Sequence, residues 1–381
     1  MFSREELHKI ITSLKSEGLS WAEIRDYINA QYDLDLTINA YQKREQRFLR
    51  QMLTSEQMKN PDEMQLMMEL GTENYKSSDY LNQANSYIRR ISREQTCKDI
   101  AEMFAEKMSS SYKLPIIQPQ ENVVVSDKCG MLCISDWHYG IEINNYNNVY
   151  NTSVARQRVT QLAIATINYI KRYKLSKLYV INLGDMIAGR IHSQIKMESR
   201  IDSVTQIMEV SEIIAEFLND LSQYVDIDYY EVLDNHSRLE PNIKESLELE
   251  SLARITGFYL KQRLKSNDKV CIKDNEYGLD IASFKVFGHD VIGVHGNKDK
   301  QKTVIESLSM YTHKFYDLVL MGHLHHMQVD ESNGTILVLN GSLMGTDSFA
   351  QKLRLSSPPT QTLIISSPDN VLESIHRIVL N

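Results

Sequence analysis

The spacing of apolar residues changes about one third of the way along the chain. Up to residue 53 they recur every three or four positions, as they do in helices packed on one side. From residue 123 onward, short runs rich in β-branched residues alternate with longer stretches of helical character. The first pattern predicts an all-α segment, and the second predicts an α/β domain.

Three helices are predicted within the first 53 residues. Residues 3–6 form a capping box that opens the first helix, and Gly18 ends it in the position that a left-handed C-cap prefers. Residues 20–23 form a second capping box, and Thr37 caps a third helix over residues 38 to about 52. The apolar residues expected to pack together are Leu7, Ile10, Ile11, Leu14, Trp21, Ile24, Tyr27 and Ile28.

The third predicted helix carries four basic side chains against the single acid Glu45. Three short helices with a tight turn between the first two resemble the helix-turn-helix module of phage and bacterial DNA-binding proteins. In that module the basic helix would enter the major groove. The alternative is a three-helix bundle that mediates protein contacts, with its charges merely solvated. The predicted DNA contacts are Lys43, Arg44, Arg47 and Arg50.

Residues 54–121 are interpreted as a helical arm and linker. The segment is rich in Gln, Glu, Lys and Met, and the serines and prolines of its last part are typical of a linker. Such an arm would connect the two domains or form a dimer seam.

Length and charge narrow the class of protein. A chain of 381 residues is expected to form at least two domains. A net charge of −8 is unfavourable for general binding to polyanions, so any nucleic-acid contact requires a local basic face. We find neither a run long enough to span a bilayer nor the apolar core of a signal peptide. A cytoplasmic protein without a membrane partner is therefore expected, and the four cysteines are expected to be reduced thiols.

Five strand-like runs of the α/β domain each lead into residues that ligate metals or move protons. The runs are residues 131–134, 178–181, 229–233, 291–294 and 316–320. The polar residues that follow them are, in order, Asp136 and His138, then Asp185, then Asn235 and His236, then His295, and finally His323 and His325. In open α/β sheets, function gathers at the carboxyl ends of the strands. Five such ends in succession predict one shared site.

The residue types favour a pair of divalent ions. Imidazoles, carboxylates and one amide suit Mn, Fe or Zn, and the absence of thiolates argues against a structural zinc site. The set holds more ligands than one open catalytic ion takes, so two ions are expected, with Mn²⁺ considered first. Two ions roughly 3.5–4 Å apart can clamp a phosphoryl group and generate a hydroxide nucleophile.

The ordered motifs resemble the signature of the calcineurin-like metallophosphoesterases over about residues 122–381. They are Asp136-x-His138, Gly184-Asp185, Asn235-His236, His295-Gly296 and Gly322-His323-x-His325. The resemblance implies an α/β fold, a four-layer sandwich of two mixed β-sheets flanked by helices. It also implies one metal at Asp136, His138 and His325, the other at Asn235, His295 and His323, a bridging Asp185, and a catalytic His236.

The sequence departs from the usual pattern at two places. Ser237 stands where many members carry the acid that orients the catalytic histidine, so Asp234 or a residue supplied in space must hold His236. The second acid that often follows Asp185 is also missing. Neither change touches a predicted ligand, so activity is expected. The residues predicted to contact phosphate, with structural roles equally open for each, are Arg190, His192 and Arg238.

The leading hypothesis is a DNA phosphodiesterase, similar to the double-strand-break repair nucleases and related phage or bacterial exonucleases. An ATPase partner and a homodimer or higher oligomer are among its expectations. One alternative is a phosphomonoesterase or small-molecule phosphodiesterase whose helical domain serves oligomerisation. Another is a DNA-binding regulator with a structural or vestigial metal site, against which the complete ligand set argues.

Overall fold

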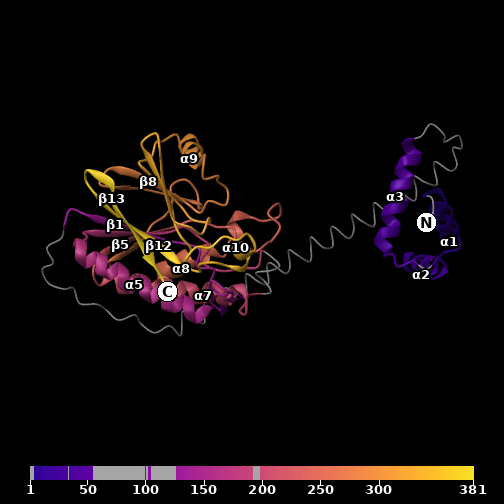
Figure 1. Ribbon diagram of the computed structural model, residues 1–381, viewed down its shortest axis with the longest axis horizontal. Coiled ribbons are helices and arrows are strands. Elements are labelled where there is room, and N and C mark those ends of the chain that lie inside the picture. Colours follow the sequence, from indigo (N-terminus) through magenta and orange to yellow (C-terminus); the bar gives the residue numbers. More distant parts are fainter. Residues whose placement is uncertain (1–3, 33, 55–98, 100–101, 104–125, 192–197) are drawn as a thin grey trace. The chain divides into compact units, whose positions relative to one another are not determined.

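The computed structural model describes residues 4–32, 34–54, 99, 102–103, 126–191 and 198–381. The chain divides into two compact units, Met1–Asp99 and Ile100–Asn381 (Figure 1). The predicted arm and linker at residues 54–121 fall almost entirely outside the described residues. The division into a three-helix module, an arm and a catalytic domain therefore stays a prediction.

The described residues of the N-terminal unit form three helices packed around a small core. They are α1 (Arg4–Ser16), α2 (Trp21–Tyr32) and α3 (Ile38–Thr54). The buried core residues are Leu7, Ile11, Leu14, Ile24, Ile28 and Tyr41. Tyr27 does not join them, contrary to expectation, and is 46% exposed. The apolar stripe of α2 runs narrowly through Ile24 and Ile28, which leaves position 27 at its edge.

The predicted helix ends are confirmed where the structure describes them. Gly18 has a φ of +84°, the left-handed conformation that follows a helix. The Ser20 backbone N–H donates to Glu23 Oε2 at 2.8 Å, and the Glu23 N–H donates to Ser20 Oγ at 3.4 Å, which is a reciprocal capping box. Thr37 Oγ1 accepts from the Ala40 N–H at 3.3 Å. The first capping box begins at Ser3, outside the described residues.

A six-stranded mixed sheet of the C-terminal unit has the order β13-β12-β1-β4-β5-β6. Its strands are β1 (Cys129–Ile134), β4 (Lys177–Asn182), β5 (Asp226–Glu231), β6 (Val270–Ile272), β12 (Thr360–Ser367) and β13 (Asn370–Val379). The first four run parallel, and β12 and β13 pair antiparallel with their neighbours.

A five-stranded mixed sheet has the order β10-β11-β9-β8-β7. Its strands are β7 (Ile281–Val286), β8 (His289–Val294), β9 (Leu318–Met321), β10 (Gln328–Ser332) and β11 (Thr335–Leu339). Here β8, β9 and β11 run parallel, whereas β7 and β10 are antiparallel edge strands. A short pair, β2 (Ile143–Asn144) and β3 (Val149–Tyr150), stands apart from both sheets.

Alternating side chains along the central strands separate the unit into four layers. On β1, Leu132 and Ile134 pack in the core beneath the helices, whereas Met131 and Cys133 pack between the sheets. The helices on that side are α5 (Thr152–Tyr173), α7 (Ser203–Ser222) and α8 (Ala253–Arg263), and the helix on the far sheet is α9 (Val304–Thr312). Figure 1 shows α5 and α7 on one side of the strands and α9 on the other.

The predicted fold class is confirmed, since two mixed sheets lie between helical layers. Both faces of the central strands are buried, which explains why they read as continuous apolar runs. Among the five strand-like runs, the largest difference from a predicted boundary is at β5, which begins at Asp226, three residues before the predicted start, because Asp226 and Asp228 interrupt its apolar pattern. Within the part of the chain that the structure describes, no helix is long and apolar enough to cross a membrane.

Candidate metal centre

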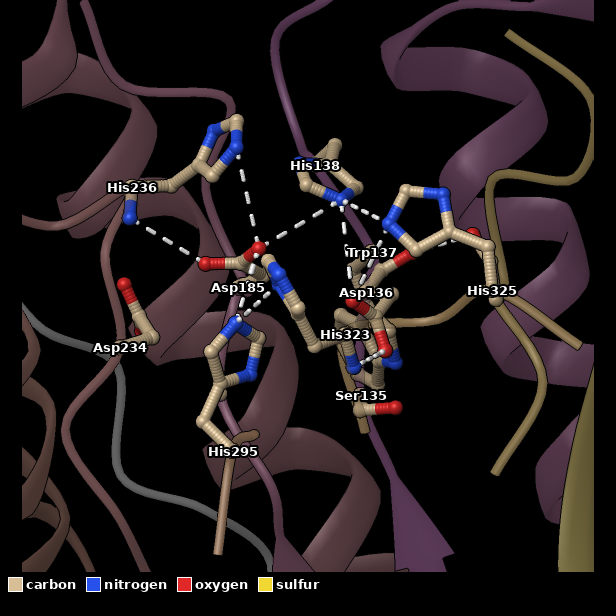
Figure 2. Close-up of polar contacts among 12 residues, drawn as sticks. Ser135, Asp136, Trp137, His138, Asp185, Asp234, His236, His295, His323 and His325 are labelled. Carbon is tan, nitrogen blue, oxygen red and sulfur yellow. Dashed lines mark hydrogen bonds and ion pairs between the residues drawn. The ribbon is translucent and has the colours of Figure 1, made fainter. Parts of the chain in front are cut away.

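The five predicted groups of polar residues meet at one end of the two sheets. The loops after β1, β4 and β5 carry residues of the first three groups, and those after β8 and β9 carry the last two. These five strands run parallel within their sheets, so their carboxyl ends share an edge. Figure 2 shows the imidazoles of this set turned toward Asp185 and Asp136.

One cluster contains Asp136, His138, Asp185 and His325, with one ligand atom of each within 4.8 Å of the others. Asp136 Oδ1 lies 3.2 Å from His325 Nε2, and Asp185 Oδ2 lies 3.8 Å from His138 Nε2. Asp136, His138 and Asp185 are buried, while the side chain of His325 is 26% exposed. Solvent therefore reaches this cluster from the side on which the partly exposed His325 lies.

A second cluster contains Asp185, His295 and His323 and shares the carboxylate of Asp185 with the first. His295 Nε2 lies 3.2 Å from Asp185 Oδ2 and 3.2 Å from His323 Nδ1. Asn235 belongs here as well, because its Oδ1 lies 2.9 Å from the same His295 nitrogen. The structure therefore brings the seven predicted ligands together, with Asp185 common to both clusters.

Two histidines have their ring orientation set by backbone carbonyls. His295 Nδ1 lies 2.7 Å from the Leu183 carbonyl oxygen, and His236 Nδ1 lies 2.7 Å from that of Ala188. A carbonyl oxygen only accepts, so Nδ1 must carry the proton in both rings. Nε2 of each ring then faces the cluster and is available to a metal or to a substrate.

The Ala188 carbonyl orients the ring of His236, a role that the acid usually following the histidine would otherwise fill. Of the two alternatives, a group supplied in space is correct. Asp234 is occupied elsewhere, because it accepts from the Ser237 N–H at 2.7 Å and from the Ser237 hydroxyl at 3.0 Å. The serine that replaces the usual acid is thus a partner of Asp234.

The loops that carry the predicted ligands contain positive φ angles, a backbone conformation that residues other than glycine rarely adopt. Among the described residues, ten non-glycine residues have a positive φ, and half of them belong to the two clusters. Those five are Asp136, His138, Asp185, His323 and His325. Asp and His tolerate the left-handed region better than most residues, yet each such position costs about 1–2 kcal/mol. Strain of this kind persists where surrounding contacts enforce it, as at functional sites.

Burial and neighbouring charged groups together set the pKa values of the residues in the two clusters. Burial and the neighbouring His236 hold the pKa of His138 well below its usual range. Burial alone would raise the pKa of Asp185, but the neighbouring His236 and His295 outweigh that effect and keep the pKa well below its usual range. Burial disfavours the charged form of His295, but the carboxylate of Asp185 raises its pKa to about 10. A divalent cation would take the place of this proton.

The donor set fits divalent metal ions. Asp136 Oδ1 is buried and lies 3.2 Å from His325 Nε2 without the geometry of a hydrogen bond, and the Nε2 atoms of His138 and His325 face each other at 3.1 Å. Converging acceptors and lone pairs of this kind are satisfied by a cation at their centre. Cys133 lies on β1 but packs between the sheets, and burial raises the pKa of its thiol to about 12. The ligands available are therefore nitrogen and oxygen atoms.

Several supporting residues carried no signal in the sequence pattern. Asn182 Oδ1 accepts from the Gly184 N–H at 3.0 Å, and Ser342 Oγ donates to the Asp136 carbonyl at 2.8 Å. Gln361 Oε1 accepts from the Ser135 N–H at 2.8 Å. Asn182 precedes Asp185 by three positions, so its place at a strand end was the only available clue.

Two of the three residues predicted to contact phosphate have other partners in the structure. Arg190 donates to the Leu239 carbonyl at 3.1 Å, and Arg238 donates to the Pro241 carbonyl at 3.4 Å. His192 lies outside the described residues. Contact between these residues and a substrate stays a prediction.

We predict that Gly189→Ala destabilises the loop that holds His236. Gly189 has a φ of +65°, and a Cβ there would lie 2.0 Å from the His236 carbonyl oxygen. Backbone strain and overpacking together should lower the free energy of unfolding by about 2–5 kcal/mol in urea titrations. Gly288→Ala is the matched control, since Gly288 also has a positive φ (+94°) but would meet nothing within 4 Å. Equal losses in the two variants would contradict the predicted contact.

Comparison with known proteins gives similarities in sequence and in structure. No protein-family profile matches the chain. The SPbeta prophage-derived uncharacterized protein YonJ of Bacillus subtilis (strain 168) is 24% identical over 358 residues, covering 88% of this chain and 86% of that protein.

Among solved structures, a novel archaeal phosphodiesterase is 15% identical, with a TM-score of 0.35, covering 66% of this chain and 99% of its own. Zinc-bound Vps29 from Entamoeba histolytica is 13% identical, with a TM-score of 0.32 and coverage of 66% and 99%. A predicted phosphoesterase from Streptococcus pneumoniae TIGR4 is 11% identical, with a TM-score of 0.27 and coverage of 66% and 98%. Similarity at this level does not identify the activity of this chain.

Proposed function

We propose that residues 122–381 form a phosphoesterase that uses two divalent metal ions, and that its substrate is DNA. The observation that carries the first part is the pair of buried ligand clusters that share Asp185, with His236 beside the shared carboxylate. Nitrogen and oxygen ligands without thiolates suit Mn²⁺, Fe or Zn. Mn²⁺ is our first choice for assays.

The chemistry of such a site is hydrolysis of a phosphoester. When bound, two divalent ions would polarise a phosphoryl group and acidify a water molecule at neutral pH. The protein holds the residues that would bind both ions in the loops just after the strands and keeps most of them buried. Because burial excludes water from the site, electrostatic interactions with a substrate phosphate are stronger there than in bulk solvent.

His236 is suited to act on the substrate and not as a ligand. Its backbone N–H donates to Asp185 Oδ1 at 3.2 Å, and its ring Nε2 lies 3.7 Å from Asp185 Oδ2. The ring also meets His138 edge to face, with centroids 4.5 Å apart. Because Nδ1 keeps its own proton bonded to the Ala188 carbonyl, a second proton on Nε2 would be the one that binds a phosphate oxygen or passes to the leaving alkoxide.

Support for DNA as the substrate comes from the N-terminal unit. Lys43, Arg44 and Arg47 are exposed on α3. The one acid among them, Glu45, turns away and lies with its carboxylate 2.6 Å from His8 Nδ1 of α1. The exposed face of α3 is therefore more basic than its composition suggests, as a phosphate-contacting helix requires. Arg50 lies on the same helix, and its side chain is outside the described residues.

The similar Bacillus subtilis protein is prophage-derived. A phage origin favours a role in DNA recombination, repair or replication, and thus a phosphodiester substrate. An ATPase partner and a homodimer or higher oligomer stay predictions.

The deciding experiment measures cleavage by the Mn²⁺-loaded full-length protein. The substrates are linear and plasmid DNA, bis-p-nitrophenyl phosphate and p-nitrophenyl phosphate. We expect cleavage of DNA and of the diester, and loss of both after treatment with a chelator. Fast hydrolysis of the monoester without DNA cleavage would instead identify a phosphomonoesterase. DNA binding without any hydrolysis would indicate a regulator.

Neutralising Lys43, Arg44 and Arg47 together to Gln should weaken DNA binding. Each lost phosphate contact should reduce the slope of log K against log salt by about 0.9, so three contacts reduce it by about 2.7. Fluorescence anisotropy with a labelled duplex at several salt concentrations measures this slope. A matched triple change of Lys265, Lys269 and Lys300, which lie in the C-terminal unit, controls for net charge. Equal slopes in the two triple variants would contradict a role for α3.

A further inference from the structure

A buried glutamine on α7 contacts the loop that follows Asp185. Gln206 is 1% exposed, although it projects from a helix on the outside of the sheet. Its Oε1 accepts from the Gly189 N–H at 2.9 Å, and its Nε2 donates to the Ile201 carbonyl at 2.9 Å. Both ends of the amide are thus paired, which a buried amide needs in order not to destabilise the fold.

Gln206 and His236 bond to the same peptide unit. The carbonyl of Ala188 accepts from His236 Nδ1, and the N–H of Gly189, in the same peptide plane, donates to Gln206 Oε1. A trans peptide points its C=O and N–H in opposite directions. The bond to Gln206 on one side therefore sets the direction of the carbonyl that meets His236 on the other.

Backbone hydrogen bonds hold the loop upstream of this peptide unit, whereas a side chain bonds to the N–H of the unit itself. Upstream of it, backbone bonds join the loop to the one after β1, with His138 N–H donating to the Asp185 carbonyl at 3.0 Å and Ala188 N–H to the Tyr139 carbonyl at 3.0 Å. Beyond Ala188 the chain enters Gly189, whose φ is +65° here. Because glycine has no Cβ, both signs of φ are accessible to it, so this residue allows the plane to turn over. Gln206 is the side chain that bonds to the N–H of this plane.

We propose that Gln206 is a positioning residue that fixes the tautomer of His236 by holding the Ala188–Gly189 peptide plane. With the plane held, Nδ1 of His236 donates and Nε2 faces Asp185. If the plane turned over, the Gly189 N–H would point at Nδ1, and the ring would have to place its proton on Nε2. The catalytic consequence rests on the proposed function, whereas the tautomer itself does not.

The first test reads the tautomer directly. Long-range ¹H–¹⁵N spectra are recorded on full-length protein with ¹⁵N-labelled histidine and diamagnetic Zn²⁺. The signals of His236 are those that disappear from the spectrum of the His236→Gln variant. We expect the Nδ1–H form in wild type and a shift toward Nε2–H in Gln206→Met. Gln206→Glu keeps the acceptor for the Gly189 N–H and should retain Nδ1–H. If Gln206→Met does not fold, Gln206→Asn replaces it, because the shorter amide cannot reach Gly189.

The second test separates positioning from stability through catalysis. Gln206→Met should lower kcat about 10- to 100-fold, as is typical for loss of a group behind a site residue. KM and metal content should stay unchanged, and the loss should be larger for esters with poor leaving groups. Gln206→Glu should restore most of kcat. Ser211→Ala removes another buried polar group of α7, bonded to Thr256, and should leave kcat unchanged.

Two results would overturn the proposal. One is an unchanged His236 tautomer in Gln206→Met or Gln206→Asn, and the other is a Glu variant that behaves like the Met variant. If wild type hydrolyses no phosphoester, the proposed function is wrong while the NMR test of the tautomer still decides this inference.

Discussion

Asp185→Asn should empty both metal positions and abolish phosphoester hydrolysis. We expect mass spectrometry of the dialysed protein to find fewer than about one divalent ion per chain, against about two in wild type. The activity should fall by about 10³-fold or more, since two bound ions supply several kcal/mol of transition-state stabilisation.

The physical reason is that Asp185 is the residue shared by both clusters. Its Oδ2 lies 3.2 Å from His295 Nε2 and 3.8 Å from His138 Nε2, one from each set of ligands. Asparagine keeps the size of the side chain but removes the negative charge. Its amide nitrogen is also no metal ligand, so two cations would lose a shared anion.

Asp228→Asn is the matched control for this change. Asp228 is also a buried carboxylate, 7% exposed, and lies on β5. It pairs with Lys177 at 2.8 Å and Lys273 at 3.4 Å and belongs to neither ligand cluster. That variant should retain about two ions per chain. Retention of both ions by Asp185→Asn would show that Asp185 is not the bridging ligand.

His236→Gln should have the second largest effect, with a different pattern. We expect metal content within error of wild type, because His236 belongs to neither ligand cluster. The kcat should fall about 10²- to 10⁴-fold, the usual contribution of a positioned acid or base. The loss should be greater for an alkyl leaving group than for p-nitrophenolate, since only the poor leaving group needs a proton.

Steady-state kinetics with the two classes of ester, together with metal analysis, checks this prediction. His326→Gln is the control, because His326 lies next to a ligand loop but is exposed and bonds through Nδ1 to the Leu324 carbonyl at 2.8 Å. It should leave kcat unchanged. A fall in metal content of His236→Gln would make His236 a ligand, and an equal loss with both esters would exclude its role as proton donor.

Local sequence patterns determined much of this protein. Predicted strands such as residues 131–134 and 178–181 lie within β1 and β4, because strands buried on both faces must be apolar at every position. The helix caps at Gly18 and Thr37 could also be predicted from the sequence, because a cap requires a particular residue type within three positions of the helix end. The polar residues behind each strand predicted the site for the same local reason.

Only the tertiary structure decided how that site is held together. The group that orients His236 is the backbone carbonyl of Ala188, 48 positions away. Because every residue has such a carbonyl, no residue type in the sequence indicates this contact. Gln206 looked like an ordinary helix residue until the fold placed its amide against Gly189. Asp185 was predicted as the bridge by resemblance, but the distances to both sets of histidines exist only once two sheets have packed together. Contacts of this kind depend on atoms brought near by packing, and local sequence periodicity does not encode them.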